Sequence, residues 1–188
     1  VSNKRANLVD EGFDVALRAS IKLGDSTLVA RKLGDLELHL YASPKYLEQR
    51  GAPVTPTDLV NHHNVIFRGQ ASFRGDASPG GAPELSRTWL LAGPSGETSV
   101  TLRGRIGGDD LSFVRAMLVA GAGIGLLPQL NCASDEASGR LVRVLPGYHA
   151  RGASLYVVYP SKKHVPARVT AFRDVVVDAF SAWAARAS

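Results

Sequence analysis

Apolar residues recur along this chain with two different periods, one typical of strands and one typical of helices. Strand patterns, either alternating or continuously apolar, occur at 13–18, 36–42 and 64–67, in both halves of a hairpin at 88–106, and at 124–128, 141–145 and 154–160. The stretch between Arg68 and Ser86 is rich in glycine, proline and serine and is predicted to be a loop. Because strands and helices alternate, the sequence predicts an α/β fold with mixed, mainly parallel sheets.

The predicted helices begin and end at residues with known capping preferences. Ser43 can cap a helix that has Pro44 at its first position, and Gly51 ends that helix. Further helices are expected at 8–11, after Thr55–Pro56, at 111–120, at 129–138 and along the apolar stripe of Val165, Val169, Phe172, Val176, Phe180 and Trp183. This stripe has steps of three and four residues and predicts a long amphipathic C-terminal helix.

The stretch "LVAGAGIGLLPQ" at 118–129 contains three alternating glycines and resembles a nucleotide-binding loop at first sight. A dinucleotide fingerprint needs a strand, a glycine turn and then a helix, whereas here the helix comes first and the strand follows. We therefore expect Gly121 or Gly123 to end the helix in the left-handed conformation. Gly125 is expected to let the strand pass close to a neighbour or a ligand.

Composition and charge limit the classes of function. The chain has 188 residues, 45% of them hydrophobic and 21% charged, which fits one folded domain or two small lobes. The net charge of +5 favours anionic partners, but the basic residues are dispersed, and the cluster "SKKH" at 161–164 is too short for a DNA interface. One cysteine excludes an internal disulfide. The absence of disulfides favours a reducing, cytoplasmic compartment, and since no long apolar stretch or leader pattern is present, we expect no membrane contact.

Candidate catalytic and metal-binding patterns are weak. No serine has a G-x-S-x-G context, and Cys132 lies on an apolar helix face, which is typical of core filling. His62 and His63 are adjacent and would point apart on a regular element, so they do not indicate a metal site. Asp109 and Asp110 at a helix start are typical of caps. The sequence therefore favours binding over catalysis, and it predicts neither an enzyme nor a cofactor.

Five stretches of the chain, taken in order, resemble the effector-binding domain of LysR-type transcriptional regulators. They are "LVDEGFDVALR" (8–18), "LVARKLGDLELHLYASPKYLEQRGAPVTPTDLVNH" (28–62), "TWLLAGPSGETSVTLRGRIGGDDLSFVRAMLVAGAGIGLLP" (88–128), "GRLVRVLPGY" (139–148) and "LYVVYPSKKHVPARVTAFRDVVVDAF" (155–180). The resemblance leaves out only the loop at 68–86. The winged helix-turn-helix and the first strand of the family are expected to lie outside these residues.

The resemblance implies a periplasmic-binding-protein-like fold of type 2, with two α/β lobes and a cleft between them. Residues 1–40 and 161–188 would form the first lobe, and residues 41–160 the second. A small-molecule effector would bind in the cleft of a domain that forms a homodimer. DNA would be bound only through the N-terminal domain of the parent protein, so we expect no operator binding by this chain itself.

Mapped onto this sequence, the implied cleft is lined by residues at strand ends and turns. They are Arg18, Ala19, Ser20, Ala42, Ser43, Pro44, Phe67, Arg68, Gly108, Asp109, Gly125 and Leu126. Arginine recognises carboxylates through two parallel hydrogen bonds, so the presence of Arg18 and Arg68 predicts an organic anion as the effector. Family members often have asparagine where this chain has Gly108, which removes a polar contact there.

Two other classes of function remain open on the sequence. A free-standing solute-binding protein of a transporter shares the fold and is the main alternative. An enzyme on the same fold is the third interpretation, disfavoured because no nucleophile or acid–base pair is evident. The residues before Val1 would distinguish the regulator from the solute-binding protein. A helix-turn-helix there indicates a regulator, and a signal peptide indicates a transporter component.

Overall fold

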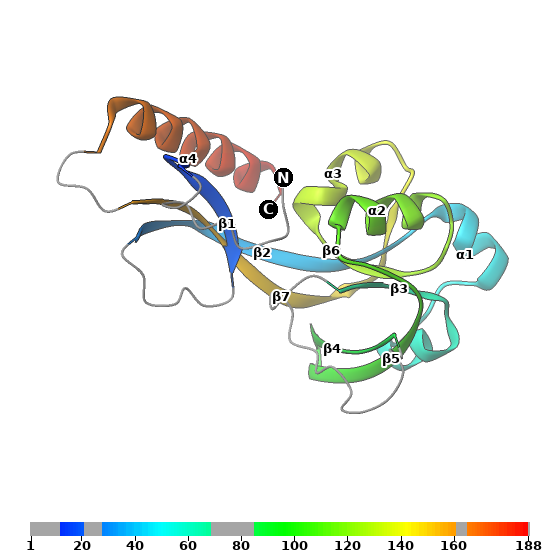
Figure 1. The fold of residues 1–188 in the computed structure, drawn as a ribbon. Coiled ribbons are helices and arrows are strands. Elements are labelled where there is room, and N and C mark those ends of the chain that lie inside the picture. The colour runs from blue at the N-terminus through cyan, green and yellow to red at the C-terminus, as the bar shows by residue number, and fades with distance from the viewer. Residues whose placement is uncertain (1–11, 21–27, 69–84, 161–164, 188) are drawn as a thin grey trace. The chain divides into compact units, whose positions relative to one another are not determined.

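The computed structural model describes residues 12–20, 28–68, 85–160 and 165–187 (Figure 1). Its strands are β1 (Ala16–Ser20), β2 (Leu28–Ala42), β3 (Asn64–Phe67), β4 (Ser86–Gly93), β5 (Gly96–Gly108), β6 (Gly125–Pro128) and β7 (Val142–Pro160). Its helices are α1 (Pro44–Arg50), the 3-10 helix η1 (Pro56–Asn61), α2 (Leu111–Val119), α3 (Gln129–Ala137) and α4 (Ala167–Ala187). The helix predicted at 8–11 and most of the predicted loop at 68–86 lie outside the described residues.

The chain divides into two compact units. Unit 1 comprises residues 1–35 and 153–188, and unit 2 comprises residues 36–152. The sequence placed these boundaries near residues 41 and 160, and the lobes 1–40, 41–160 and 161–188 remain a prediction. Both boundaries of the units fall inside long strands, β2 and β7, so neither a turn nor a change of composition marks them in the sequence.

In unit 1, α4 packs on a short antiparallel sheet. Strand β1 pairs with β7, with Ala16 opposite Val158, and α4 lies over these strands (Figure 1). The core consists of Val157, Tyr159 and Val169, with Val15, Leu33 and Val176 packed against it. Arg168 on α4 donates hydrogen bonds of 2.9 and 3.0 Å to the carboxylate of Asp14. These contacts attach the C-terminal helix to the start of β1.

The apolar stripe predicted for the C-terminal helix faces the core only in part. Val169 is 2% exposed and Val176 packs against the core, whereas 42% of Phe172 is exposed. Val165 precedes the helix. The period of the pattern predicted the helix correctly, but it did not determine how much of the stripe is covered.

Unit 2 is built on a mixed sheet with the strand order β3-β5-β4-β7-β2-β6. The mixed sheet is confirmed, but the expectation of mainly parallel strands is wrong for the described strands. β1–β7, β2–β6, β4–β5 and β4–β7 pair antiparallel, and β3–β5 pairs parallel. The expectation rested on the alternation of strands and helices along the chain, but this order does not determine the direction of strands such as β2 and β7, whose partners come from distant segments. The hairpin at β4–β5 is antiparallel because a tight turn joins its strands.

Successive residues of β2 supply the two cores of unit 2. Leu38 and Leu40 are buried in one cluster together with Leu59 and Leu91. Tyr41 is buried in a second cluster, beneath α2 and α3, which lie on the same side of the sheet (Figure 1). The last five residues of β2 are all buried, because this strand is covered on both faces.

The three glycines at 121–125 have the conformations and contacts expected from the sequence. Gly121 has φ +84° and directly follows the end of α2. At Gly123, with φ +156°, a Cβ atom would lie 2.2 Å from the carbonyl oxygen of His63. At Gly125 it would lie 3.2 Å from the carbonyl oxygen of Val65. The stretch therefore ends a helix and brings β6 against β3, and it does not form a nucleotide-binding loop.

Two predicted strands are longer in the structure. β2 begins at Leu28 instead of Leu36, and β7 joins the predicted strands 141–145 and 154–160 into one. Pro146 and Gly147 are residues typical of the end of a strand, so the sequence predicted two separate strands here. The backbone nevertheless continues past them as part of β7, with a local kink at Leu145, where φ is +51°.

A buried carboxylate joins α2 to α3. Asp135 of α3 is fully buried and accepts a hydrogen bond from Nε of Arg115 in α2. Its other oxygen lies 2.7 Å from Nη2 of Arg140, just beyond α3. The exposed fractions of the two arginine side chains are 35% and 54%, so each can reach water. The buried carboxylate of Asp135 is thus the one charge of the cluster that is stabilised by its ion-pair partners alone, without water.

Replacing Asp135 with alanine is expected to lower the free energy of unfolding by about 3 kcal/mol. This is the lower end of the range for a broken buried ion pair, because both arginines keep access to water. Urea denaturation measures the change, with Asp174→Ala as a control that removes only the exposed pair of Asp174 with Arg173. Equal midpoints for Asp135→Ala and the original chain would contradict this role.

A buried histidine in β2 is held in its neutral form. His39 is 7% exposed, and its Nδ1 has no hydrogen-bond partner among the described residues. Its Nε2 lies 3.5 Å from the carboxylate of Glu37, and its ring centre lies 6.4 Å from that of His149. Burial lowers the pKa of His39, and the charge of Arg143 lowers it further, while Glu37 opposes the shift.

The stability of the protein should therefore fall as the pH decreases from about 7 to about 5. Below the unfolded-state pKa of about 6.5, the unfolded chain binds a proton that the folded state disfavours at His39. Urea unfolding at several pH values should show a smaller decrease for His39→Gln than for the original chain. Part of the decrease should persist, because the pKa values of His62 and His63 are also lowered by burial. Identical pH profiles for the two proteins would rule out His39 as a source.

Candidate functional site

Three parallel strands of unit 2 end at the same edge. β3 runs parallel to β5, with Phe67 opposite Gly108, and a parallel bridge between Asn64 and Ile124 aligns β6 with β3. The carboxyl ends of β3 and β5 therefore meet at residues 67–68 and 107–109, and β6 ends there at Pro128. In open α/β sheets, ligands bind at the carboxyl ends of parallel strands. This edge is the candidate functional site of unit 2.

Arg68 follows β3 and lies against glycines at the end of β5. Its backbone N–H donates a hydrogen bond of 2.7 Å to the carbonyl oxygen of Gly108. A Cβ atom at Gly107 would lie 3.1 Å from Cδ of Arg68 and 2.3 Å from Cδ2 of Leu85. A Cβ atom at Gly108 would lie 2.4 Å from the ring of Phe113. The two glycines thus make room for the arginine stem and the aromatic ring, while Arg68 itself is exposed.

Two helices begin beside these strand ends. The carboxylate of Asp110 accepts a hydrogen bond of 3.0 Å from the N–H of Phe113 and caps α2, as the sequence predicted. α3 begins directly after β6, and its cap residue Pro128 makes no side-chain hydrogen bond. The first N–H groups of a helix carry partial positive charge. Arg68 and the start of α3 therefore favour an anion at this edge. The negative charges of Asp109 and Asp110 oppose it.

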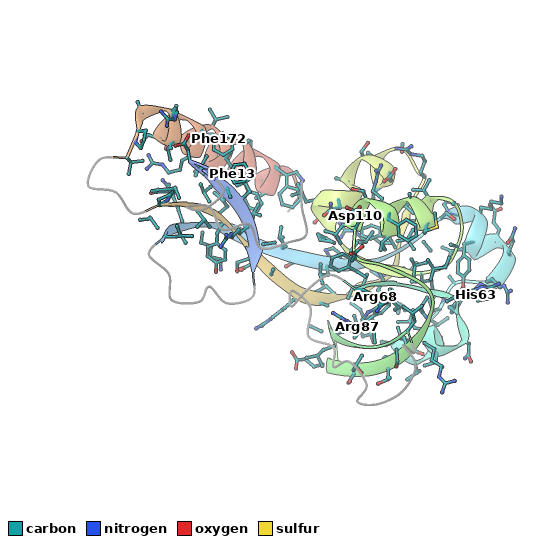
Figure 2. The ribbon with its side chains drawn as sticks, viewed as in Figure 1. Phe13, His63, Arg68, Arg87, Asp110 and Phe172 are labelled. Carbon is teal, nitrogen blue, oxygen red and sulfur yellow. The ribbon has the colours of Figure 1, made fainter. Side chains whose placement is uncertain are left out.

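Arg87 on β4 is a basic residue that the sequence analysis missed; it pairs with Leu102 of β5 and so lies toward the amino end of β3. It has the same parity along the strand as Trp89 and Leu91, which are buried in the core, so its side chain lies on the core face. Burial lowers the pKa of the Arg87 guanidinium, although an arginine remains charged at neutral pH. Figure 2 labels Arg87 on β4, together with Arg68 and Asp110 of the candidate edge. The sequence feature that could have identified Arg87 is its spacing: it precedes the apolar residues Trp89 and Leu91 by two and four positions, on the same face of the strand.

A second group of predicted site residues lies along β6 and toward the amino end of β3. Gly125 pairs with Tyr41 and Leu126 pairs with Leu40, so residues 42–44 follow at the amino end of β3. The four residues of β3 span about 13 Å, at roughly 3.3 Å per residue. The structure thus brings Phe67, Arg68, Gly108 and Asp109 together and leaves Ala42, Ser43 and Pro44 at the other end of β3, while Gly125 and Leu126 lie beside Val65 and Ile66 in the middle of that strand.

The side chains at 42–44 serve the local fold. Ser43 is 3% exposed, and its hydroxyl accepts a hydrogen bond of 3.3 Å from the N–H of Tyr46, which caps α1. Pro44 occupies the first turn of that helix, and Ala42 is fully buried. Gly51 ends the helix with φ +74°. The helix predicted here is confirmed, while the effector contacts of these residues remain a prediction.

The predicted residues before the crossover belong to unit 1. Arg18, Ala19 and Ser20 lie on β1, opposite Tyr156, Leu155 and Ser154 of β7. They form the carboxyl end of that short strand. Their participation in an effector site remains a prediction.

Other reactive side chains of unit 2 have structural surroundings. Cys132 is fully buried, and burial raises the pKa of its thiol to about 12, so the thiol stays protonated. The Tyr46 hydroxyl lies 3.1 Å from Nδ1 of His62, and Nη1 of Arg105 lies 3.0 Å from Nε2 of His63. Within the described ranges, no group of three His, Cys, Asp or Glu side chains is placed to hold a metal ion. None of the described helices is long and apolar enough to cross a membrane.

Comparison with known proteins identifies the family. The family described as LysR substrate binding domain matches residues 1–181. An uncharacterized HTH-type transcriptional regulator of Haemophilus influenzae is 30% identical over 169 residues, which cover 90% of this chain and 54% of that protein. The HTH-type transcriptional activator AaeR of Escherichia coli is 30% identical, with 93% of this chain and 52% of the activator covered. The chain thus spans about half the length of the curated relatives it matches.

Solved structures of regulatory domains agree with this match. The regulatory domain of CrgA, a LysR-type transcriptional regulator from Neisseria meningitidis, is 27% identical with a TM-score of 0.75, covering 95% of this chain and 81% of that one. The regulatory domain of AphB from Vibrio vulnificus, treated with cumene hydroperoxide, is 29% identical with a TM-score of 0.70, covering 94% and 80%. The predicted fold class and the predicted resemblance are therefore confirmed. The chain belongs to the LysR substrate-binding domain family.

Proposed function

We propose that this chain is the ligand-sensing domain of a LysR-type transcriptional regulator and that its effector is an organic anion. The observation that carries the proposal is the placement of Arg68 at the carboxyl ends of parallel strands, with its stem against Gly107. Among the described residues, none pairs with the guanidinium of Arg68. The relatives are named as transcriptional regulators, which disfavours the solute-binding protein of a transporter.

The chemistry of the edge suits recognition of a carboxylate. A guanidinium offers two parallel N–H donors to a carboxylate, and the start of α3 adds partial positive charge. Asp109 is exposed at the same edge and would repel a second negative group placed near it. The effector is thus an anion with one carboxylate toward Arg68 and a neutral or hydroxyl-bearing part toward Asp109.

The remaining parts of the function follow from the family. The chain binds its effector without converting it, and the parent protein acts in the cytoplasm on DNA through residues outside this chain. The effector contacts assigned to Arg18, Ala19, Ser20 and residues 42–44 belong to this proposal, as do those of Gly125 and Leu126. Effector binding is relayed through a homodimer. A conformational change within one monomer can reach the DNA-binding part only if it alters the geometry of an interface with a second monomer.

Arg68→Ala is expected to weaken binding of the best organic anion by about 10- to 100-fold, the range for loss of a charged hydrogen-bond pair. A panel of aromatic and aliphatic carboxylates is screened by thermal shift, and the strongest binder is then titrated by calorimetry. Arg50→Ala, an exposed arginine at the end of α1, is the matched control and should bind normally. The proposal fails if the strongest ligand is a cation or if both variants bind alike.

Light scattering at micromolar concentration should give about twice the chain mass of 20.0 kDa. Leu130 on α3 is 42% exposed and offers an apolar contact for a partner. Leu130→Asp should therefore lower the measured mass, whereas Val60→Asp, at an exposed valine of η1, should not. A single-chain mass over a hundredfold concentration range would contradict the homodimer.

A further inference from the structure

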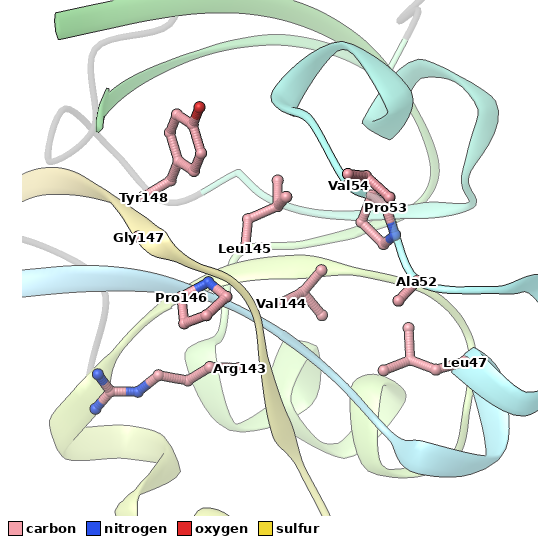
Figure 3. A pocket seen from close by; sticks show the side chains of 10 residues that line it. All are labelled: Leu47, Ala52, Pro53, Val54, Arg143, Val144, Leu145, Pro146, Gly147 and Tyr148. Atoms are coloured by element: carbon pink, nitrogen blue, oxygen red, sulfur yellow. The ribbon is translucent and has the colours of Figure 1, made fainter. Parts of the chain in front are cut away.

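A hollow of about 370 Å³ lies in unit 2 between the end of α1, the segment after it and β7 (Figure 3). Its volume is within the range of roughly 300–1,000 Å³ that is typical of small-molecule sites. It shares no residue with the predicted effector contacts. We propose that this hollow is a second ligand site, which takes an uncharged molecule with one or two aromatic rings.

A kink in β7 creates the hollow. Leu145 has φ +51° and is the one non-glycine residue with positive φ among the described residues. In a regular strand, neighbouring side chains point to opposite faces, but Val144 and Leu145 are both buried in the same core cluster. A leucine in the left-handed region is under conformational strain, and such strain is concentrated at functional sites. The kink exposes the edge of this core cluster to the hollow.

The walls of the hollow are apolar and fixed by neighbouring residues. The ring of Tyr148 packs on Gly93, where a Cβ atom would lie 2.3 Å from the ring. Across from it, Pro53 is buried, while Val54 is 83% exposed (Figure 3). Leu47 of α1 packs against the same core cluster as Tyr148. A ring entering this space covers Val54 and meets Leu47 and Tyr148 without displacing a polar group.

The one charged residue of the lining does not call for a charged ligand. Arg143 belongs to the lining, but its Nε lies 2.7 Å from the carboxylate of Glu136. A paired guanidinium offers little attraction to an anion, and burying a carboxylate without a partner is unfavourable. The hydroxyl of Tyr148 is the neutral polar group of the lining. The hollow therefore selects uncharged rings over carboxylates, the reverse of the edge at Arg68.

Indole is the probe, and benzoate is its charged counterpart. Titration of the full chain, followed by NMR of backbone and methyl groups, should give saturable shifts at Leu47, Val144, Leu145 and Tyr148 at roughly millimolar indole or below. Benzoate should shift these residues at least about tenfold more weakly. Ala52 lines the mouth and is exposed, so Ala52→Phe should fill it and weaken indole binding at least about tenfold. Ala137→Phe, at an exposed alanine of α3, is the matched control and should bind as before.

A second variant keeps the test decisive if Ala52→Phe does not fold. Val54→Asp places a carboxylate on the exposed rim and should also weaken indole binding, with the fold retained because Val54 is 83% exposed. The proposal is overturned if no saturable shifts occur at the four residues, if shifts centre on Arg68 and Gly108, or if benzoate binds as well as indole. It is also overturned if the folded variants bind indole like the original chain. The loss of anion binding in Arg68→Ala is a separate measurement, so failure of the hollow and failure of the effector site can be told apart.

Discussion

The close approach of residues 123–125 to β3 is the constraint on which unit 2 depends. The N–H of Ile124 donates to the carbonyl oxygen of His63 at 2.8 Å, and the N–H of Val65 donates to that of Ile124 at 2.9 Å. A Cβ atom at Gly123 would lie 2.2 Å from the carbonyl oxygen of His63, so a side chain there would clash with it. Because this contact brings β6 parallel to β3, it also places the start of α3 at the same edge as Arg68. The glycines that resemble a nucleotide-binding loop therefore act through the backbone, by fixing the strand order that the candidate site requires.

Local signals in the sequence predicted local structure well, because their causes are local. Ser43 and Gly51 begin and end α1, and Asp110 caps α2, as their side chains and backbone freedom dictate. The direction of the strands could not be predicted in this way, since hydrogen-bond partners lie far away in the chain. The continuity of β7 was missed for a related reason. Pro146 and Gly147 are typical of a turn, and only the packing of β7 within unit 2 keeps the chain extended past them.

The sequence predicted part of the arrangement around the candidate site, and the residues that it grouped differently share one physical cause. Arg68 and Gly108 were correctly placed together because each directly follows or ends a strand, and parallel strands carry their ends to one edge. The sequence grouped Gly125 with them, and the structure has it at the beginning of β6, while its effector contact remains a prediction. Whether a residue lies at the first or last position of a strand decides its end of the sheet, and sequence similarity to a family motif does not reveal this. Arg87 was missed because the predicted hairpin began at residue 88, whereas β4 begins at Ser86.

Pairing, more than residue type, determines what each arginine of unit 2 can recognise. The carboxylate of Glu136 already holds Arg143, so the hollow beside it behaves as a neutral, apolar space. Arg115 is likewise engaged by the buried carboxylate of Asp135, where its charge contributes to the attachment of α2 to α3. Arg68 differs, because its stem rests on a glycine and no described carboxylate binds its head. Paired guanidinium groups thus stabilise the fold, whereas the guanidinium at the carboxyl ends of parallel strands is the one on which the proposed anion site rests.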